Sequence, residues 1–397
     1  MTSPETPSPH PILAALSAIE DAVDGARRRV APRVPAYIAA YRGFGDAAGL
    51  DLCGRVLADA PEGGPTGNDS RWRNLQHSIG RFLTAEVARA PLQVRVGPHV
   101  VDAITDDEGY YAATLPAPPA PDGLWTQASV SLADGRLATS QPALYVHDDV
   151  GVGVISDIDD TVLDSSITDW TTAAQLTFLH NARTRKPLKG AALLYQALQA
   201  GLDGRGRLPL FYVSSSPWNL YDLLDEFMRL NALPAGPMFL RDLGLDPTKL
   251  LKSPGHGHKL DRVRQLVTRF PRLRWVLLGD SGQADAGLYA DAASEFGDRI
   301  AAIYIRDVDP DLDSPRDVAV DAHIGRVAGT RVPMIRARDS RAIAEHAASI
   351  GLIRPGTLES IAAEVARDAA RPTLVEAATT AAIEGTQAKD GPDPPVG

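Results

Sequence analysis

The sequence contains almost no cysteine and no long uninterrupted apolar run. Its single cysteine, Cys53, excludes an intramolecular disulfide and a cysteine-based zinc cage. Because it lies in the apolar pattern of residues 52–57, we interpret it as a small buried core residue. No stretch reaches the roughly 18 uncharged apolar residues that a transmembrane helix requires, so the sequence predicts none.

Basic residues are also comparatively scarce. The chain has 40 Lys and Arg against 50 Asp and Glu, a formal net charge of −10, which argues against a nucleic-acid-binding surface. Residues 1–10 are rich in Pro and Ser and lack the basic start of a secretory signal. We therefore expect a cytoplasmic protein that does not bind nucleic acid, with peripheral membrane association and the oligomeric state left open.

The length of 397 residues is enough for two or three domains. Residues 1–10 and the Ala/Thr/Pro-rich residues 371–397 are predicted to be disordered. Residues 11–34 place apolar side chains at alternating steps of four and three, which predicts an amphipathic helix. Its basic end is compatible with a membrane-surface or coiled-coil helix, but packing against the neighbouring domain is the favoured interpretation.

Residues 35–150 combine short apolar segments with turn residues, a pattern typical of a small β-sandwich-like accessory domain. The expected strands are Tyr37–Tyr41, Leu52–Leu57, Leu92–Val96, Gly109–Leu115 and Ala143–Val146. One helix is expected at Ser70–Val87, with Ser70 as its cap. No acid pair or histidine cluster stands out in this region, so we interpret it as non-catalytic.

Residues 151–370 alternate strand-like and helical segments, which predicts an α/β domain built on a doubly wound parallel sheet. The expected strands are Val152–Ile155, Leu210–Val213, Trp275–Leu278 and Ile300–Ile305. The expected helices are Lys189–Ala200, Leu220–Leu230, Lys259–Phe270, Ser340–Ile350 and Thr357–Asp368.

The first of these strands leads into the acidic segment Asp157-Ile158-Asp159-Asp160-Thr161. Residues two apart in an extended chain point to the same side, so Asp157 and Asp159 both face the carboxyl end of the sheet, where open α/β sheets bind ligands. Two carboxylates held this close favour a cation between them, and Mg²⁺ suits carboxylate and phosphate oxygens. An aspartate placed there can act as a nucleophile. A surface turn is the alternative for this segment taken alone, but the catalytic interpretation is favoured.

A serine and a lysine follow later strands. Ser214 comes directly after Leu210–Val213, where a hydroxyl suits a phosphate oxygen, and Ser215 stays open as the alternative because the register is uncertain by one residue. Lys259 opens a helix, a position unfavourable for a cation against the helix dipole. That cost indicates a functional reason, such as neutralising a phosphoryl group.

A second acidic pair follows the strand Trp275–Leu278. Gly279 permits close backbone approach, and Asp280 and Asp285 can converge on a cation from beyond the strand. Each segment alone is compatible with an ordinary turn, but four of them carrying this chemistry in this order form a specific combination.

The order of these motifs resembles that of the haloacid-dehalogenase-like phosphatases: DxDxT at residues 157–161, then Ser214, Lys259 and GDSGQxD at residues 279–285. More narrowly, the strings SDIDDT, YVSSSPWNL, GHK, LLGDSGQAD and IYIRDV are similar to the catalytic domain of the actin-patch-associated phosphatidate phosphatases, which is related in its motifs to the lipins. The resemblance covers about residues 150–308.

The resemblance implies a role for each catalytic residue. Asp157 is the nucleophile on phosphorus, and Asp159 is the general acid for the leaving alkoxide and then the base for the hydrolytic water. Lys259 and Ser214 hold phosphate oxygens, and Thr161 fixes the loop.

The same resemblance implies a Mg²⁺ site. Asp157, the backbone carbonyl of Asp159 and Asp280 are the expected ligands, and Asp285 supports them. Two positions depart from the family pattern: no basic residue follows soon after Thr161, and Ala286 stands where a proline is expected.

The leading hypothesis is a Mg²⁺-dependent phosphatidate phosphatase of phospholipid metabolism, which releases diacylglycerol and phosphate through an aspartyl-phosphate intermediate. A phosphatase for a soluble phosphomonoester is the alternative, because no lipid groove is evident in the sequence. A membrane-recruitment or binding module with a vestigial phosphatase site is the third hypothesis.

Overall fold

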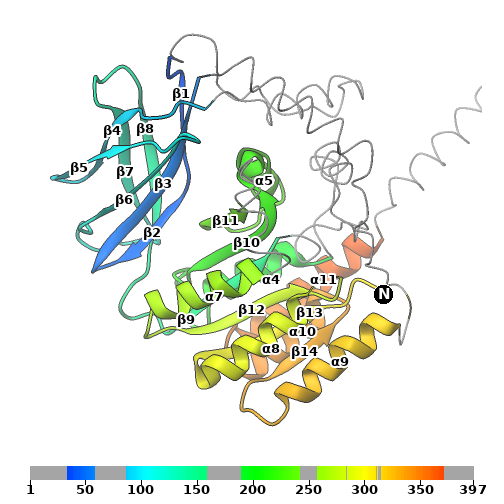
Figure 1. Ribbon diagram of the computed structural model, residues 1–397. Helices are drawn as coiled ribbons and strands as arrows, with labels where there is room; N and C mark the ends of the chain where they lie inside the picture. The colour runs from blue at the N-terminus through cyan, green and yellow to red at the C-terminus, as the bar shows by residue number, and fades with distance from the viewer. Residues whose placement is uncertain are drawn as a thin grey trace, which may run out of the picture.

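The computed structural model describes residues 34–58, 86–158, 189–241 and 257–370, apart from residues 283, 310, 312 and 313. Two sheets organise these residues (Figure 1). The predicted helix at 11–34, except its last residue, and both predicted disordered termini lie outside the described residues. The predicted helix Ser70–Val87 also lies outside them except for its last two residues, of which Glu86 forms a β-bridge with Leu57 instead.

The N-terminal sheet has the strand order β1-β3-β2-β8-β7-β4-β5, with β6 paired to β3. Its strands are β1 (Tyr37–Ala40), β2 (Gly43–Asp46), β3 (Gly49–Leu57), β4 (Pro91–Val96), β5 (His99–Ile104), β6 (Tyr110–Leu115), β7 (Trp125–Leu132) and β8 (Ala138–Tyr145). Their inward side chains enclose a separate apolar core. The five expected strands are present, and β2, β5 and β7 are additional. All eight belong to one hydrogen-bonded sheet, and the sandwich-like arrangement stays a prediction.

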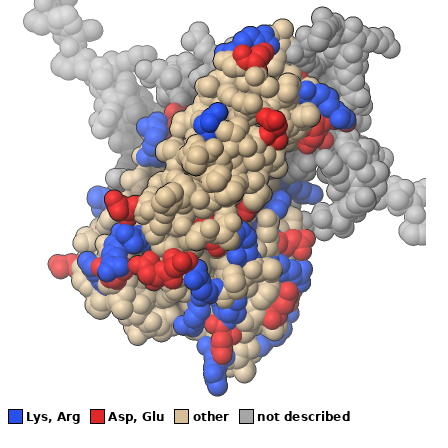
Figure 2. Space-filling view, turned by 90° about the vertical axis from the view of Figure 1, so that its left-hand side faces the viewer, with Lys and Arg blue, Asp and Glu red and all other residues tan. Residues whose placement is uncertain are grey.

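One side of the molecule, seen in Figure 2, carries scattered charges around a largely uncharged middle. The exposed positions of β7 and β8 include Gln127, Ser129 and Ser140, which are polar and uncharged. Charge therefore does not concentrate into a basic patch on this visible side of the described residues.

The second sheet confirms the predicted α/β class with a parallel sheet. Its strands are β9 (Val152–Asp157), β10 (Leu210–Pro217), β11 (Met238–Arg241), β12 (Arg274–Asp280), β13 (Ile300–Arg306) and β14 (Met334–Ala337). All pair in parallel in the order β11-β10-β9-β12-β13-β14. The chain runs outward from β9 in one direction and then crosses back to β12, so the order reverses beside β9. Open α/β sheets bind ligands at the carboxyl ends of strands at such a reversal.

Helices cover both faces of the parallel sheet (Figure 1). Alternate strand residues such as Val154 and Ile155 point into two different apolar clusters. Helices α4 (Ala191–Ala200), α5 (Tyr221–Leu230), α10 (Ser340–Ser349) and α11 (Leu358–Ala369) contribute to one cluster. Helices α7 (Gly257–Arg269), α8 (Asp285–Phe296) and α9 (Pro315–Val327) contribute to the other.

The remaining helical segments are short 3-10 turns: η1 (Trp218–Leu220), η2 (Gly297–Arg299) and η3 (Pro355–Thr357). Among the described helices, none combines the length and the apolar character needed to cross a membrane.

The two sheets pack against each other through aromatic side chains. Phe44 of β2 belongs to the apolar cluster of the α/β part rather than to the core of its own sheet. Its ring centroid lies 5.6 Å from that of Phe211 in a T-shaped arrangement and 5.5 Å from that of Phe239. Edge-to-face pairs of this kind add to the stabilisation from burial alone. The N-terminal sheet is therefore anchored directly on the core beneath β10 and β11.

Gly153 provides a test of this core. A Cβ at this position would lie 2.6 Å from the ring of Trp275, its partner on β12, so Gly153→Ala forces the indole or the strand to move. Overpacking of this kind costs about 1–3 kcal/mol of unfolding free energy, measured by chemical denaturation. Gly151→Ala is the matched control, because a Cβ there would have no atom within 4 Å. Equal stability of the two variants contradicts the prediction.

Candidate active site

Three strand ends meet at the reversal point of the parallel sheet. Val213 of β10 is in register with Asp157, the last residue of β9. On the other side, Leu278 of β12 is in register with Ser156. Asp159 and Thr161 lie outside the described residues, whereas Asp157, Ser214, Lys259, Asp280 and Asp285 are all described.

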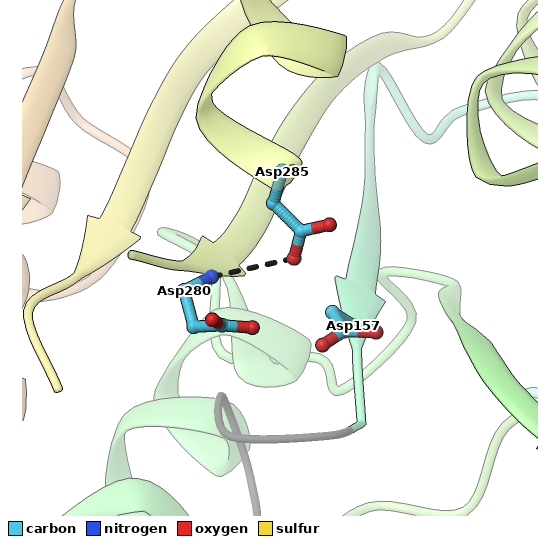
Figure 3. Close-up of side chains that lie close together, drawn as sticks. All are labelled: Asp157, Asp280 and Asp285. Atoms are coloured by element: carbon cyan, nitrogen blue, oxygen red, sulfur yellow. Dashed lines mark hydrogen bonds between the residues drawn. The ribbon is translucent and has the colours of Figure 1, made fainter. Parts of the chain in front are cut away.

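Three buried carboxylates converge at this point (Figure 3). Each of Asp157, Asp280 and Asp285 offers one ligand atom, and these atoms all lie within 4.8 Å of one another. The backbone N–H of Asp280 donates to Asp285 Oδ2 at 3.3 Å, and the N–H of Gly282 donates to Asp280 Oδ1 at 2.6 Å. The predicted convergence of the two acidic segments is therefore present in the structure.

The convergence depends on the absence of a side chain at Gly279. This residue follows Leu278 on β12 and faces the start of α8. A Cβ there would lie 2.7 Å from Asp285 Cβ and 2.7 Å from the ring of Tyr289. Any other residue would force β12 or the start of α8, which carries Asp285, to shift, so close packing favours glycine here.

Lys259 joins the cluster from the first turn of α7. Its side chain is 1% exposed, and Nζ lies 2.8 Å from Asp157 Oδ1 and 2.8 Å from Asp285 Oδ1. The helix dipole disfavours a positive charge in the first turn of α7, and this double ion pair explains why Lys259 is nevertheless placed there. Three carboxylates and one ammonium leave these four groups with a formal charge of minus two. A buried excess of this sign favours either proton uptake or a bound cation.

The two candidate serines follow Val213 on β10. Ser214 is fully buried, and its Oγ accepts a hydrogen bond from the Ser216 N–H at 2.9 Å. Nε2 of His258 lies 3.3 Å from the Ser214 carbonyl oxygen. Ser215 is half-buried. Both hydroxyls therefore lie within two residues of the position that pairs with Asp157.

Asp157 is supported from the opposite face of β9 by Ser156 and Tyr195, of which Tyr195 lies outside the motifs. Ser156 Oγ donates to the Asp157 carbonyl at 2.7 Å and lies 2.6 Å from the hydroxyl of Tyr195 on α4. Burial raises the pKa of Tyr195, so this hydroxyl stays protonated at neutral pH. Ser156 can be recognised next to Asp157 in the sequence, whereas Tyr195 cannot, because it lies 39 residues away from Ser156.

The last motif, IYIRDV, also supports the site indirectly. The Ser281 N–H donates to the carbonyl of Arg306 at 2.8 Å, and the Val308 N–H donates to Ser281 Oγ at 3.1 Å. These bonds fix the segment that follows Asp280 against the end of β13.

The site lies within a segment similar to known proteins. Residues 152–307 match the family model described as "Phosphatidate phosphatase APP1, catalytic domain". Over this segment the chain is similar to the APP1 catalytic-domain family. The five described site residues all fall inside it.

Two curated relatives share the APP1-type segment. Phosphatidate phosphatase APP1 of Saccharomyces cerevisiae is 32% identical over 166 residues, which cover 42% of this chain and 27% of the yeast protein. An uncharacterized protein of Schizosaccharomyces pombe is 28% identical over 168 residues, again 42% of this chain and 27% of its own. The match thus spans about a quarter of the length of each relative.

A solved structure of a carbohydrate acetylesterase from Xanthomonas citri covers 80% of this chain and 75% of its own, at 10% identity. Its TM-score of 0.29 is too low to carry an argument about fold or function.

Lys259 provides a test of the buried cluster. Lys259→Met removes the ammonium from between two buried carboxylates, and breaking a buried pair in this way costs about 3–5 kcal/mol of unfolding free energy. Arg264→Met on the same helix is the control, because its pairs with Asp261 and Glu295 are solvent-exposed and contribute little. Chemical denaturation of both variants measures the difference. Similar losses would show that Lys259 does not hold the cluster together.

Proposed function

We propose that this protein is a Mg²⁺-dependent phosphatidate phosphatase that hydrolyses phosphatidic acid to diacylglycerol and phosphate, with a haloacid-dehalogenase-like core. The observation that carries the proposal is Asp157, buried at the sheet reversal with Lys259 Nζ 2.8 Å from its Oδ1. Phosphatidate as the substrate is supported by the family match and by the name of the yeast relative. A cytoplasmic location with peripheral membrane association belongs to the same proposal.

In this proposal Asp157 attacks phosphorus directly. Its Oδ forms a bond to phosphorus while the ester P–O bond breaks, and Asp159 gives its proton to the departing alkoxide. A water then attacks the aspartyl-phosphate, Asp159 takes the proton, and Asp157 is regenerated with release of phosphate. The roles of Lys259 and Ser214 are to hold the phosphoryl oxygens, whose charge must be balanced in the transition state.

The described residues fit a magnesium ion. Carboxylate oxygens are its preferred protein ligands, and three buried carboxylates offer ligand atoms within 4.8 Å of one another. Asp157 and Asp280 would hold the ion together with the Asp159 carbonyl, and Asp285 would support them while it orients Lys259. When bound, Mg²⁺ neutralises charge on the phosphoryl oxygens and offsets the formal excess of minus two in the cluster.

The proposed activity is tested by phosphate release from two kinds of substrate, phosphatidate vesicles and a short soluble phosphomonoester, each with Mg²⁺ and with EDTA. The wild-type chain is expected to hydrolyse phosphatidate only with Mg²⁺. Asp157→Asn is expected to lose activity at least about a thousandfold while it stays folded, because it removes the nucleophile. Asp203→Asn, a change on an exposed turn, is the matched control.

The other outcomes identify the competing functions. Release from the soluble ester alone would assign a soluble phosphomonoester as the substrate. Vesicle binding in EDTA with no hydrolysis of any ester would indicate a binding module. Full turnover by Asp157→Asn would overturn the catalytic assignment.

A further inference from the structure

The N-terminal sheet contacts the segment that carries the candidate phosphate-binding serines. We propose that this sheet supports the catalytic site from outside. In this proposal Arg55 and Tyr41 hold the strand-end turn, defined as residues 214–220, in position. The inference rests on the proposed function and assigns a role to a sheet that lies outside the matched segment.

The backbone of the strand-end turn leaves regular sheet pairing just where the serines lie. The pairing of β10 with β9 ends at Val213. Its pairing with β11 is interrupted between Val213 and Pro217. Ser214 and Ser216 are joined to each other by the hydrogen bond from the Ser216 N–H to Ser214 Oγ. This hydrogen bond links Ser214 to the residues that follow it, Pro217 to Leu220.

Tyr41 holds the turn by ring stacking. It lies in the connection between β1 and β2, and its ring centroid is 4.5 Å from that of Trp218 with an interplanar angle of 21°. The same ring is 4.4 Å from that of Tyr221 at the start of α5. The backbone N–H of the next residue, Arg42, donates to the Tyr221 hydroxyl at 2.8 Å. The first residue of η1, Trp218, and the residue that follows η1, Tyr221, thus both contact the β1–β2 connection.

Arg55 holds the turn by a directed hydrogen bond. Its Nη1 donates to Asn219 Oδ1 at 2.7 Å, across 164 residues of sequence. Its other donors are used within the N-terminal region: Nη2 to Glu86 Oε1 at 2.8 Å, and Nε to the Glu108 carbonyl at 2.9 Å. Its guanidinium also lies 4.5 Å from the ring centroid of Tyr110.

The guanidinium is buried, and three contacts besides the one to Asn219 hold it in place. A planar group with a fixed fork of donors defines the position of its acceptor more closely than a flexible ammonium does. Catalysis is sensitive to such positioning, since a displacement of about 1 Å costs on the order of a hundredfold in rate. Arg55 is a positioning residue in this scheme, acting on the site through Asn219 and the strand-end turn.

A second contact between the same two parts provides a matched control. Arg269 Nη1 donates to Asp46 Oδ2 at 3.0 Å, and Nη2 donates to Asp46 Oδ1 at 3.1 Å and to the Gly49 carbonyl at 3.0 Å. It therefore joins α7 to the N-terminal sheet without touching the strand-end turn. It lies ten residues beyond Lys259, about 15 Å along the helix axis at 1.5 Å per residue.

The experiment compares kcat and KM for phosphate release from phosphatidate vesicles in Arg55→Met and Arg269→Met, at a temperature where thermal unfolding shows both to be folded. Arg55→Met is expected to lower kcat about tenfold to a hundredfold, since it frees the turn. Arg269→Met is expected to keep kcat within about twofold of the wild type, since its contacts lie away from the turn. A general loosening of the two parts would lower kcat equally in both variants.

A double-mutant test separates positioning from mere stability. Ser214→Ala and Ser215→Ala are made singly, and the one that lowers kcat is combined with Arg55→Met. If Arg55 acts through that serine, the double variant is expected to lose less than about twofold beyond the serine variant. Fully multiplicative losses, equal effects of Arg55→Met and Arg269→Met, or no effect of either serine change would overturn the inference. A wild-type chain that releases no phosphate would instead overturn the proposed function itself.

Discussion

The ammonium of Lys259, held between the carboxylates of Asp157 and Asp285, is the interaction on which the arrangement of the site depends. Without a cation there, two buried carboxylates would face each other in a region closed to water. The fold brings these groups together because α7 and α8 both start at the edge where the parallel strands end, on the same face of the sheet. Gly279 leaves the space that lets α8 approach closely enough.

The two sheets have connected roles in this arrangement. The parallel sheet places an acid at each of two strand ends beside its reversal point, and hydrogen bonds through Ser156 support the first of them from the opposite face. Within the described ranges of the chain, the N-terminal sheet supplies no side chain to the cluster of Asp157, Asp280 and Asp285. It contacts the strand-end turn through Tyr41 and Arg55 instead. The carboxylates of the site and the side chains that contact the strand-end turn thus come from segments far apart in the sequence.

Much of the fold is predictable because its strands carry a local signal. Strands β9, β10, β12 and β13 each contain a run of apolar residues. The meeting of the carboxyl ends of these strands predicts the convergence of Asp157, Asp280 and Lys259. Strands β11 and β14 have four residues each, too few to show a period. Strand β5 lies at the sheet edge, and most of its residues are exposed. Its sequence therefore lacks the alternation of apolar and polar residues that marks a strand with one buried face. Contacts such as Arg55 to Asn219 span 164 residues and need the tertiary structure to be seen.

The most direct test of Asp157 as the nucleophile is to trap its covalent intermediate. Sodium borohydride reduces an aspartyl-phosphate to homoserine, which mass spectrometry locates in the sequence. Wild-type protein quenched during turnover of phosphatidate with Mg²⁺ is expected to contain homoserine at position 157, and protein quenched without substrate is expected to retain aspartate there. Turnover with an unmodified Asp157, or homoserine at a different aspartate, would contradict the proposed role of Asp157.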